Sequence, residues 1–110
     1  MKRCYSLKRN KEFSYVYRSG KSAACRSLVI VYRKNRVGSV KIGLSVSKRI
    51  GKSVVRNRVK RQLRAVLTPL IPSIKTGFSI IFIARSPILT GRYADIEKSV
   101  KHLLEKASLL

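Results

Sequence analysis

The densest group of reactive side chains in the sequence is a run of cations between residues 48 and 64. Eight lysine and arginine residues occupy these positions, and neither aspartate nor glutamate occurs among them. Ammonium and guanidinium groups bind phosphate oxygens, lysine as a point charge and arginine through paired hydrogen bonds. Like charges repel at helical spacing, so we favour a bound counter-charge over a merely solvated basic face. The run consists of Lys48, Arg49, Lys52, Arg56, Arg58, Lys60, Arg61 and Arg64.

The charge of the whole chain favours the same interpretation. Its 110 residues suffice for a single domain, 1–110, and contain 26 lysine and arginine against 4 aspartate and glutamate, a net charge of +22. From Asp95 onward acids and bases balance, so the excess lies in residues 1–94. We therefore expect a basic binding body at 1–94, a neutral packing helix at 90–108, and a polyanionic partner.

Catalytic and metal-binding motifs are missing from the sequence. A two-metal nuclease needs clustered carboxylates, yet Glu12 is the only acid before residue 95. A metal-free ribonuclease needs a general acid and a general base, and His102 is the only histidine. Cys4 and Cys25 have neither metal-ligand spacing nor the number that a disulfide framework needs. We expect no catalytic and no metal-ligating residue, so any bond cleavage would draw its catalytic groups largely from the partner.

The start of the chain and its hydropathy bear on location. The basic first residues are not followed by an apolar stretch, and no run of about 18 apolar residues occurs. We therefore expect a cytoplasmic protein with no membrane partner and no small-molecule substrate. Binding of the basic run to a membrane surface is disfavoured, because Pro69 ends it early and its apolar side is needed for a core.

Apolar periodicity predicts the elements of the first half. Asn10 is placed to cap a helix that Gly20 ends. Phe13, Val16 and Tyr17 share one face of it, where the two aromatic rings either pack in the core or stack on unpaired bases. We expect the helix at 10–18, a short strand or a bend at 22–24, and strands at 28–32 and 40–46. The last two strands would pair as an antiparallel hairpin through the short loop between them.

The second half contains a helix with two different faces. Ser53 is placed to cap it, and Pro69 disfavours its continuation. Five apolar residues lie on one side, namely Val55, Val59, Leu63, Val66 and Leu67, and Asn57, Lys60, Arg61 and Arg64 lie on the other. Residues 78–83 form an apolar strand for the centre of a sheet, and Thr90 is placed to cap the last helix. This order gives an α+β sandwich of one sheet with helices, in which a parallel crossover would by default be right-handed.

A specific combination of residues occupies the segment 40–64. A strand ends in Ser45-Val46-Ser47-Lys48, a turn follows at Gly51, and one helix holds both Arg56-Asn57-Arg58 and Lys60-Arg61. This combination resembles the signature of the bacterial ribonuclease P protein component, and the resemblance extends over almost the whole chain. It implies a single-domain αβββαβα sandwich with a mainly antiparallel sheet. It also implies an unusual left-handed βαβ crossover through the Arg-Asn-Arg helix, against the general rule.

The resemblance also implies a function. Proteins of this family bind the catalytic RNA of ribonuclease P and the 5′ leader of precursor tRNA, and they assist the endonucleolytic removal of that leader. The cofactor Mg²⁺ is bound mainly by the RNA, which carries the catalytic groups. By this resemblance the chain would be an accessory subunit of a ribonucleoprotein, with the catalytic RNA and precursor tRNA as its partners.

Two binding surfaces are implied in the same way. The first is the Arg-Asn-Arg helix with its lead-in, which faces the catalytic RNA and consists of Lys48, Arg49, Lys52, Arg56, Asn57, Arg58, Lys60, Arg61 and Arg64. The second is a cleft between the first helix and the sheet, which holds the leader and consists of Phe13, Tyr17, Val29, Val31, Lys60 and Arg64. Val31 stands where the family has a strand aromatic, and Tyr32 is expected to point to the other face.

Two other classes of protein remain open at this point. A ribosomal protein or an RNA chaperone would suit the charge, the size and the fold class, although the Arg-Asn-Arg block argues against it. A helix-turn-helix repressor would need a helix joined by a short turn before the recognition helix, where this sequence has a strand.

Overall fold

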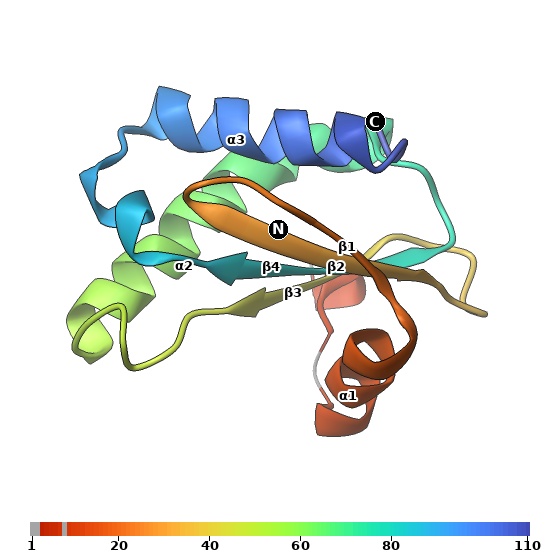
Figure 1. Cartoon of the computed structure of the whole chain (residues 1–110). Helices are drawn as coiled ribbons and strands as arrows, with labels where there is room; N and C mark the ends of the chain where they lie inside the picture. The colour runs from red at the N-terminus through yellow and green to blue at the C-terminus, as the bar shows by residue number, and fades with distance from the viewer. Residues whose placement is uncertain (1–2, 8) are drawn as a thin grey trace.

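The helices and strands follow one another in the order αβββαβα (Figure 1). The computed structural model describes residues 3–7 and 9–110, and within them it contains three α-helices and four strands. The predicted order and the α+β class are confirmed. The α-helices are α1 (Asn10–Ser19), α2 (Ser53–Leu67) and α3 (Tyr93–Lys106), the strands are β1 (Lys21–Ala24), β2 (Leu28–Lys34), β3 (Lys41–Ser45) and β4 (Phe78–Ala84), and the 3₁₀ segments are η1 (Arg3–Tyr5), η2 (Thr68–Ser73) and η3 (Ser86–Thr90).

Strand β4 lies inside the sheet, between β2 and β3. It runs antiparallel to β2 and parallel to β3, and β1 completes the sheet by antiparallel pairing with β2. The predicted central position of residues 78–83 is confirmed, whereas the predicted hairpin between 28–32 and 40–46 is wrong. A strand that is apolar on both faces is best buried between two neighbours, so β4 separates two strands that are adjacent in the chain. The loop between those strands passes the start of β4, where the Asn35 N–H donates to the Gly77 carbonyl oxygen at 2.8 Å.

The sheet carries a different helical layer on each face (Figure 1). Because side chains alternate along a strand, Ile80 and Phe82 of β4 face α2 and α3, whereas Ile81 faces α1. Alternation along β2 likewise puts Val31 in the α1 layer and Tyr32 against the other layer, as the sequence predicts. The sheet therefore separates the long basic helix α2 from α1.

The predicted cap residues do not hold the helix starts. The N-cap positions of α1, α2 and α3 are Arg9, Lys52 and Arg92, where the sequence predicts Asn10, Ser53 and Thr90. The last helix begins later than predicted because Thr90 ends η3, donating from its hydroxyl to the Pro87 carbonyl oxygen at 3.0 Å. At the start of α3 the Asp95 carboxylate accepts a hydrogen bond from the Arg92 N–H at 2.9 Å. Helices α1 and α2 begin without a side-chain cap.

Two glycines allow α1 to lie close against the sheet. Gly20 ends the helix as predicted, and a Cβ atom there would lie 2.5 Å from the Val16 carbonyl oxygen of α1 and 2.9 Å from the Tyr32 carbonyl oxygen of β2. A Cβ atom on Gly43 of β3 would lie 2.7 Å from the Phe13 ring and 3.2 Å from Leu7. A side chain at either position would push α1 away from the sheet.

We expect Gly43→Ala to lower the free energy of unfolding by about 1–3 kcal/mol, because the added methyl group overlaps the Phe13 ring. Equilibrium unfolding in urea measures this loss. In the double variant with Phe13→Leu the two losses should be less than additive, since the smaller side chain makes room for the methyl group. Strict additivity would show that the ring is not the obstacle.

Candidate nucleic-acid interface

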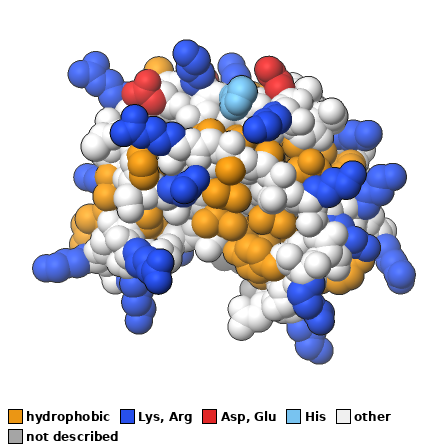
Figure 2. Space-filling view, in the orientation of Figure 1, with side chains coloured by type: hydrophobic (Ala, Val, Ile, Leu, Met, Phe, Trp, Pro, Cys, Tyr) orange, Lys and Arg blue, Asp and Glu red, His pale blue; other side chains and the backbone are white. Residues whose placement is uncertain are grey.

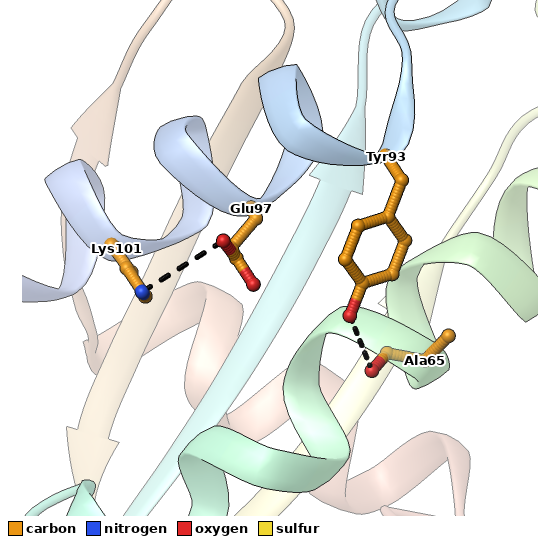
Figure 3. A network of polar contacts seen from close by, with 4 residues as sticks. All are labelled: Ala65, Tyr93, Glu97 and Lys101. Carbon is orange, nitrogen blue, oxygen red and sulfur yellow. Dashed lines mark hydrogen bonds and ion pairs between the residues drawn. The ribbon is translucent and has the colours of Figure 1, made fainter.

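Helix α2 is held by its apolar side, and this turns its other side to the solvent. Val59 and Leu63 are fully buried in the core that α2 shares with the sheet and α3. Helix α3 packs on α2, and the Tyr93 hydroxyl donates a hydrogen bond to the Ala65 carbonyl oxygen at 3.2 Å (Figure 3). Contacts with the sheet and with α3 together fix the rotation of α2 about its own axis.

The side of α2 that the sequence predicts to face RNA is largely exposed. We call this side and its lead-in, nine residues from Lys48 to Arg64, the basic face. Arg56 and Lys60 are partly buried, and the Arg56 guanidinium folds back to donate to the Ser53 hydroxyl at 3.1 Å. The exposed members are Lys48, Arg49, Lys52, Asn57, Arg58, Arg61 and Arg64.

Two buried side chains shape the lead-in to α2. Val46 and Ile50 both insert into the core on the α2 side of the sheet. The Ile50 N–H donates to the Ser47 carbonyl oxygen at 3.1 Å, which closes a turn between the two anchors. Lys48 and Arg49 lie in this turn and are exposed just before the first turn of α2.

Nothing acidic offsets the positive charge at the start of α2. Its first turn contains no acidic residue, and its N-cap, Lys52, makes no side-chain hydrogen bond to the helix. The unpaired N–H groups of a helix start carry partial positive charge, which adds to that of the cations before it. Such a helix start binds anions, and phosphate in particular.

The acids lie elsewhere on the molecule. In the described ranges 3–7 and 9–110 the structure contains an ion pair within α3, where Lys101 and Glu97 are 3.8 Å apart (Figure 3). On the face shown in Figure 2 the acidic side chains gather along α3, whereas lysine and arginine side chains surround the rest. The positive charge of the basic face is therefore available to a partner.

The two aromatic residues on one flank of α1, Phe13 and Tyr17, differ in burial. The ring centroids of Phe13 and Tyr17 are 6.5 Å apart, with the planes tilted by 38°. Phe13 packs against the α1 layer, whereas Tyr17 is 44% exposed. Tyr15 lies on the opposite flank of the helix and contacts Arg33, near one end of β2. The flank of Phe13 and Tyr17 therefore faces the other end of β2, where Val29 lies.

The sheet surface beside this flank is formed by one row of residues from three strands. Val29 pairs with Ile83 of β4, which pairs in turn with Ser45 of β3, and all three are partly buried. Val31, in contrast, is 9% exposed beneath α1, so it belongs to the packed layer. Figure 2 shows the surface hollowed between α1 and the start of α2. The sequence did not identify Ile83 and Ser45, because their place beside Val29 depends on the register of β4.

Lys60 and Arg64 come from the other layer. Both belong to α2, which packs on the face of the sheet opposite α1 (Figure 1). The structure therefore groups Phe13, Tyr17 and Val29 on the α1 side and places Lys60 and Arg64 with the basic face. Their contact with the leader stays a prediction.

The described residues do not form a metal site. Within residues 3–7 and 9–110, no group of three or more histidine, cysteine, aspartate or glutamate side chains lies close enough together to hold an ion. Cys4 and Cys25 are free thiols. In the same ranges no helix is both long and apolar enough to cross a membrane.

Known proteins match this chain along almost its full length. The sequence profile of the family Ribonuclease P matches residues 1–108. This chain belongs to the ribonuclease P protein family. The ribonuclease P protein component of Oceanobacillus iheyensis is 47% identical over 111 residues, which cover 100% of this chain and 92% of that protein. The component of Clostridium botulinum strain Langeland is 44% identical, with 94% of each chain covered.

Solved ribonuclease P proteins have the same fold. The RNase P protein of Staphylococcus aureus aligns with a TM-score of 0.88 at 33% identity, covering 96% of each chain. That of Thermotoga maritima aligns with a TM-score of 0.84 at 25% identity, covering 92% of this chain and 96% of the other. Membership of the ribonuclease P protein family implies a ribonuclease role in the processing of tRNA 5′ ends, in partnership with ribonuclease P RNA and precursor tRNA.

We expect Arg61→Ala to weaken binding to ribonuclease P RNA and to reduce the slope of log K against log salt by about one, because each lost phosphate contact releases about one counterion fewer. Fluorescence anisotropy at a series of salt concentrations measures the slope. Lys98→Ala removes an exposed cation from α3 and should leave the slope unchanged. Equal slopes for the wild type and Arg61→Ala would exclude Arg61 from the interface.

The aromatic residues of α1 should respond differently to truncation. Phe13→Ala should lower the free energy of unfolding by about 2–4 kcal/mol, because its ring packs in the α1 layer. Tyr17→Ala should change stability by only about 0.5 kcal/mol but weaken binding of a single-stranded RNA about tenfold through lost stacking. Tyr17→Phe keeps the ring and serves as the control. If Tyr17→Ala is strongly destabilised but binds RNA normally, Tyr17 is a packing residue and its assignment to base stacking is wrong.

Proposed function

We propose that this chain is the protein subunit of ribonuclease P and acts in the cytoplasm. It binds the catalytic RNA through the basic face and the 5′ leader of precursor tRNA beside α1, and it assists the Mg²⁺-dependent removal of the leader. The observation that carries this proposal is the uncompensated positive charge of α2 and its lead-in, in a chain of the ribonuclease P protein family.

The side chains of this protein are suited to binding rather than to bond cleavage. Hydrolysis of a phosphodiester needs a group that activates the nucleophile and one that stabilises the leaving oxygen. His102 lies exposed on α3, and Asp95, Glu97 and Glu105 belong to the same helix rather than to the basic face. We therefore assign the catalytic groups to the RNA.

The donor set of the protein does not fit Mg²⁺. This ion prefers six oxygen ligands in octahedral geometry, commonly carboxylates, phosphates and water. Glu12 is the only carboxylate in residues 1–94, and the described residues bring no three acidic, histidine or cysteine side chains together. In this proposal the RNA holds the ions, and the cations of the protein neutralise phosphates that would otherwise require more Mg²⁺.

The two surfaces contribute different contacts. Lysine and arginine contacts to phosphates fix the position of the protein on the catalytic RNA without reading its sequence. The Asn57 amide both donates and accepts, so it can bond to base edges or ribose hydroxyls between Arg56 and Arg58. Tyr17 stacks on an unpaired base of the leader. A leader in the hollow between α1 and the start of α2 lies near the cations of the lead-in.

Cleavage of precursor tRNA by a bacterial ribonuclease P RNA at low, near-physiological Mg²⁺ tests the proposal. We expect the RNA with this protein to release the 5′ leader, the RNA alone to cleave much more slowly, and the protein alone to be inert. Binding of the RNA without a change in cleavage would count against the proposal and favour a ribosomal or RNA-chaperone protein. Cleavage by the protein alone would refute catalysis by the RNA.

We expect Asn57→Ala to lower the cleavage rate at low Mg²⁺ about tenfold, because the lost hydrogen bonds to RNA are worth about 1.4 kcal/mol. Its melting temperature should stay close to that of the wild type, since Asn57 is exposed. Asn10→Ala, at the exposed first residue of α1, is the matched control. Wild-type cleavage by Asn57→Ala under these conditions would remove Asn57 from the interface.

A further inference from the structure

A second hollow lies on the flank of α1 that the proposed function does not use. It has a volume of about 640 Å³ and is formed by the N-terminal segment, α1, the loop after β2 and the start of β3. Helical spacing places Glu12 and Tyr15 on this flank, opposite Phe13 and Tyr17. Sites for small organic ligands have volumes of about 300–1,000 Å³, so the hollow is large enough for one nucleotide.

Cations surround the mouth of this hollow. Arg9 at the start of α1, Lys34 at the end of β2 and Arg36 in the following loop all line it and are exposed. Lys41 lines it as well, and its ammonium donates to the Cys4 carbonyl oxygen, which ties the N-terminal segment to β3. The ion pair found among residues 3–7 and 9–110 lies on α3, so within these ranges the cations of the hollow are not paired with an acid.

The loop after β2 is held in one conformation by Asn35. Its side-chain oxygen accepts hydrogen bonds from the Val37 and Gly38 N–H groups, each at 3.1 Å. Its side-chain nitrogen donates to the Ser39 carbonyl oxygen at 3.0 Å and to the buried Ser79 hydroxyl at 3.2 Å. A loop that is already ordered loses little conformational entropy when a ligand binds.

Tyr15 forms an aromatic wall beside the cations. Its side chain is 47% exposed, and the Arg33 guanidinium carbon lies 4.8 Å from the centre of its ring. Arg33 also donates from Nη1 to the Ser19 carbonyl oxygen at 2.9 Å, so it braces both the ring and the helix against β2. Leu7 and Val16, both buried, add apolar lining. The hollow thus combines an apolar interior with a cationic mouth.

We propose that this hollow binds one guanosine nucleotide of a single-stranded RNA. Lys34 and Arg36 hold the phosphate, and the base lies against Tyr15. Glu12, the single carboxylate of the lining, accepts hydrogen bonds from the base. Guanine presents two adjacent N–H donors on its pairing edge, so a carboxylate selects it over adenine. The inference rests on the proposed function for the source of the nucleotide, since free guanosine monophosphate (GMP) has the same chemistry.

Nuclear magnetic resonance of the isotope-labelled full chain tests the site without the catalytic RNA. On titration with GMP we expect saturable shifts of the Tyr15, Val16 and Val37 amide signals, with adenosine monophosphate (AMP) binding about tenfold more weakly. Inorganic phosphate should shift the Arg36 signal and leave that of Val16 in place. GMP-induced shifts confined to α2 would overturn the proposal.

Three variants test which side chains contact the phosphate of the nucleotide and which contact its base. Lys34→Gln/Arg36→Gln should weaken GMP binding about tenfold or more, whereas Lys98→Gln/Lys106→Gln, which removes the same charge from α3, should not. Glu12→Gln should reduce the preference for GMP over AMP to about twofold or less. Equal weakening in both double variants, or an unchanged preference in Glu12→Gln, would refute the assignment.

A short single-stranded RNA with one guanosine, compared with the same strand carrying adenosine, distinguishes the sources of the nucleotide. If the guanosine strand binds more tightly than GMP, the ligand is an RNA. If the guanosine and adenosine strands bind equally, the RNA ligand is overturned in favour of a free nucleotide. These titrations need no cleavage. If cleavage fails but GMP still binds, only the proposed function is refuted. If cleavage is normal but GMP causes no shifts, only this nucleotide site is refuted.

Discussion

The burial of strand β4 on both faces is the constraint on which the rest of the structure depends. Ile80 and Phe82 anchor the layer of α2 and α3, and Ile81 anchors α1, so a single strand holds two helical layers on opposite sides of the sheet. Its pairing with β2 and β3 then determines which residues of those strands stand side by side. Because protein interiors are tightly packed, a change of volume in β4 would disturb the basic face and the α1 side together.

Apolar packing, not attraction within the chain, decides where the positive charge lies. A fully buried valine or leucine contributes about 1.5–3 kcal/mol, and Val59 and Leu63 are two such residues on α2. A pair of like charges at helical spacing costs only about 0.2–0.5 kcal/mol. Burial therefore outweighs repulsion, and α2 folds with its cations unpaired. The repulsion that remains among these cations is relieved when phosphates bind. The unpaired charge therefore destabilises the free protein and favours the complex.

The sequence predicted the features that follow from periodicity within one element, but it did not predict which strands pair with one another. Alternation placed Val31 and Tyr32 on opposite faces, and helical spacing separated the cations of α2 from its buried side. The short loop after β2 favoured a hairpin, but an apolar strand from far along the chain gains more burial between β2 and β3. The row of Val29, Ile83 and Ser45 exists only in the resulting register, so no local pattern could identify it.

The same topology imposes an order on the synthesis of the chain. Among the four strands β3 pairs only with β4, whose last residue is Ala84, and a single bridge joins its Ile42 to Ser6. Folding during translation proceeds as partners emerge from the ribosome, so β3 lacks its strand partner and α2 has no complete sheet to pack on until residues 78–84 appear. In that interval the cations of α2 are exposed to the RNA of the ribosome itself. The fold is completed late in translation, and a nascent chain cut before Phe78 keeps only the β1–β2 pair of the four-stranded sheet.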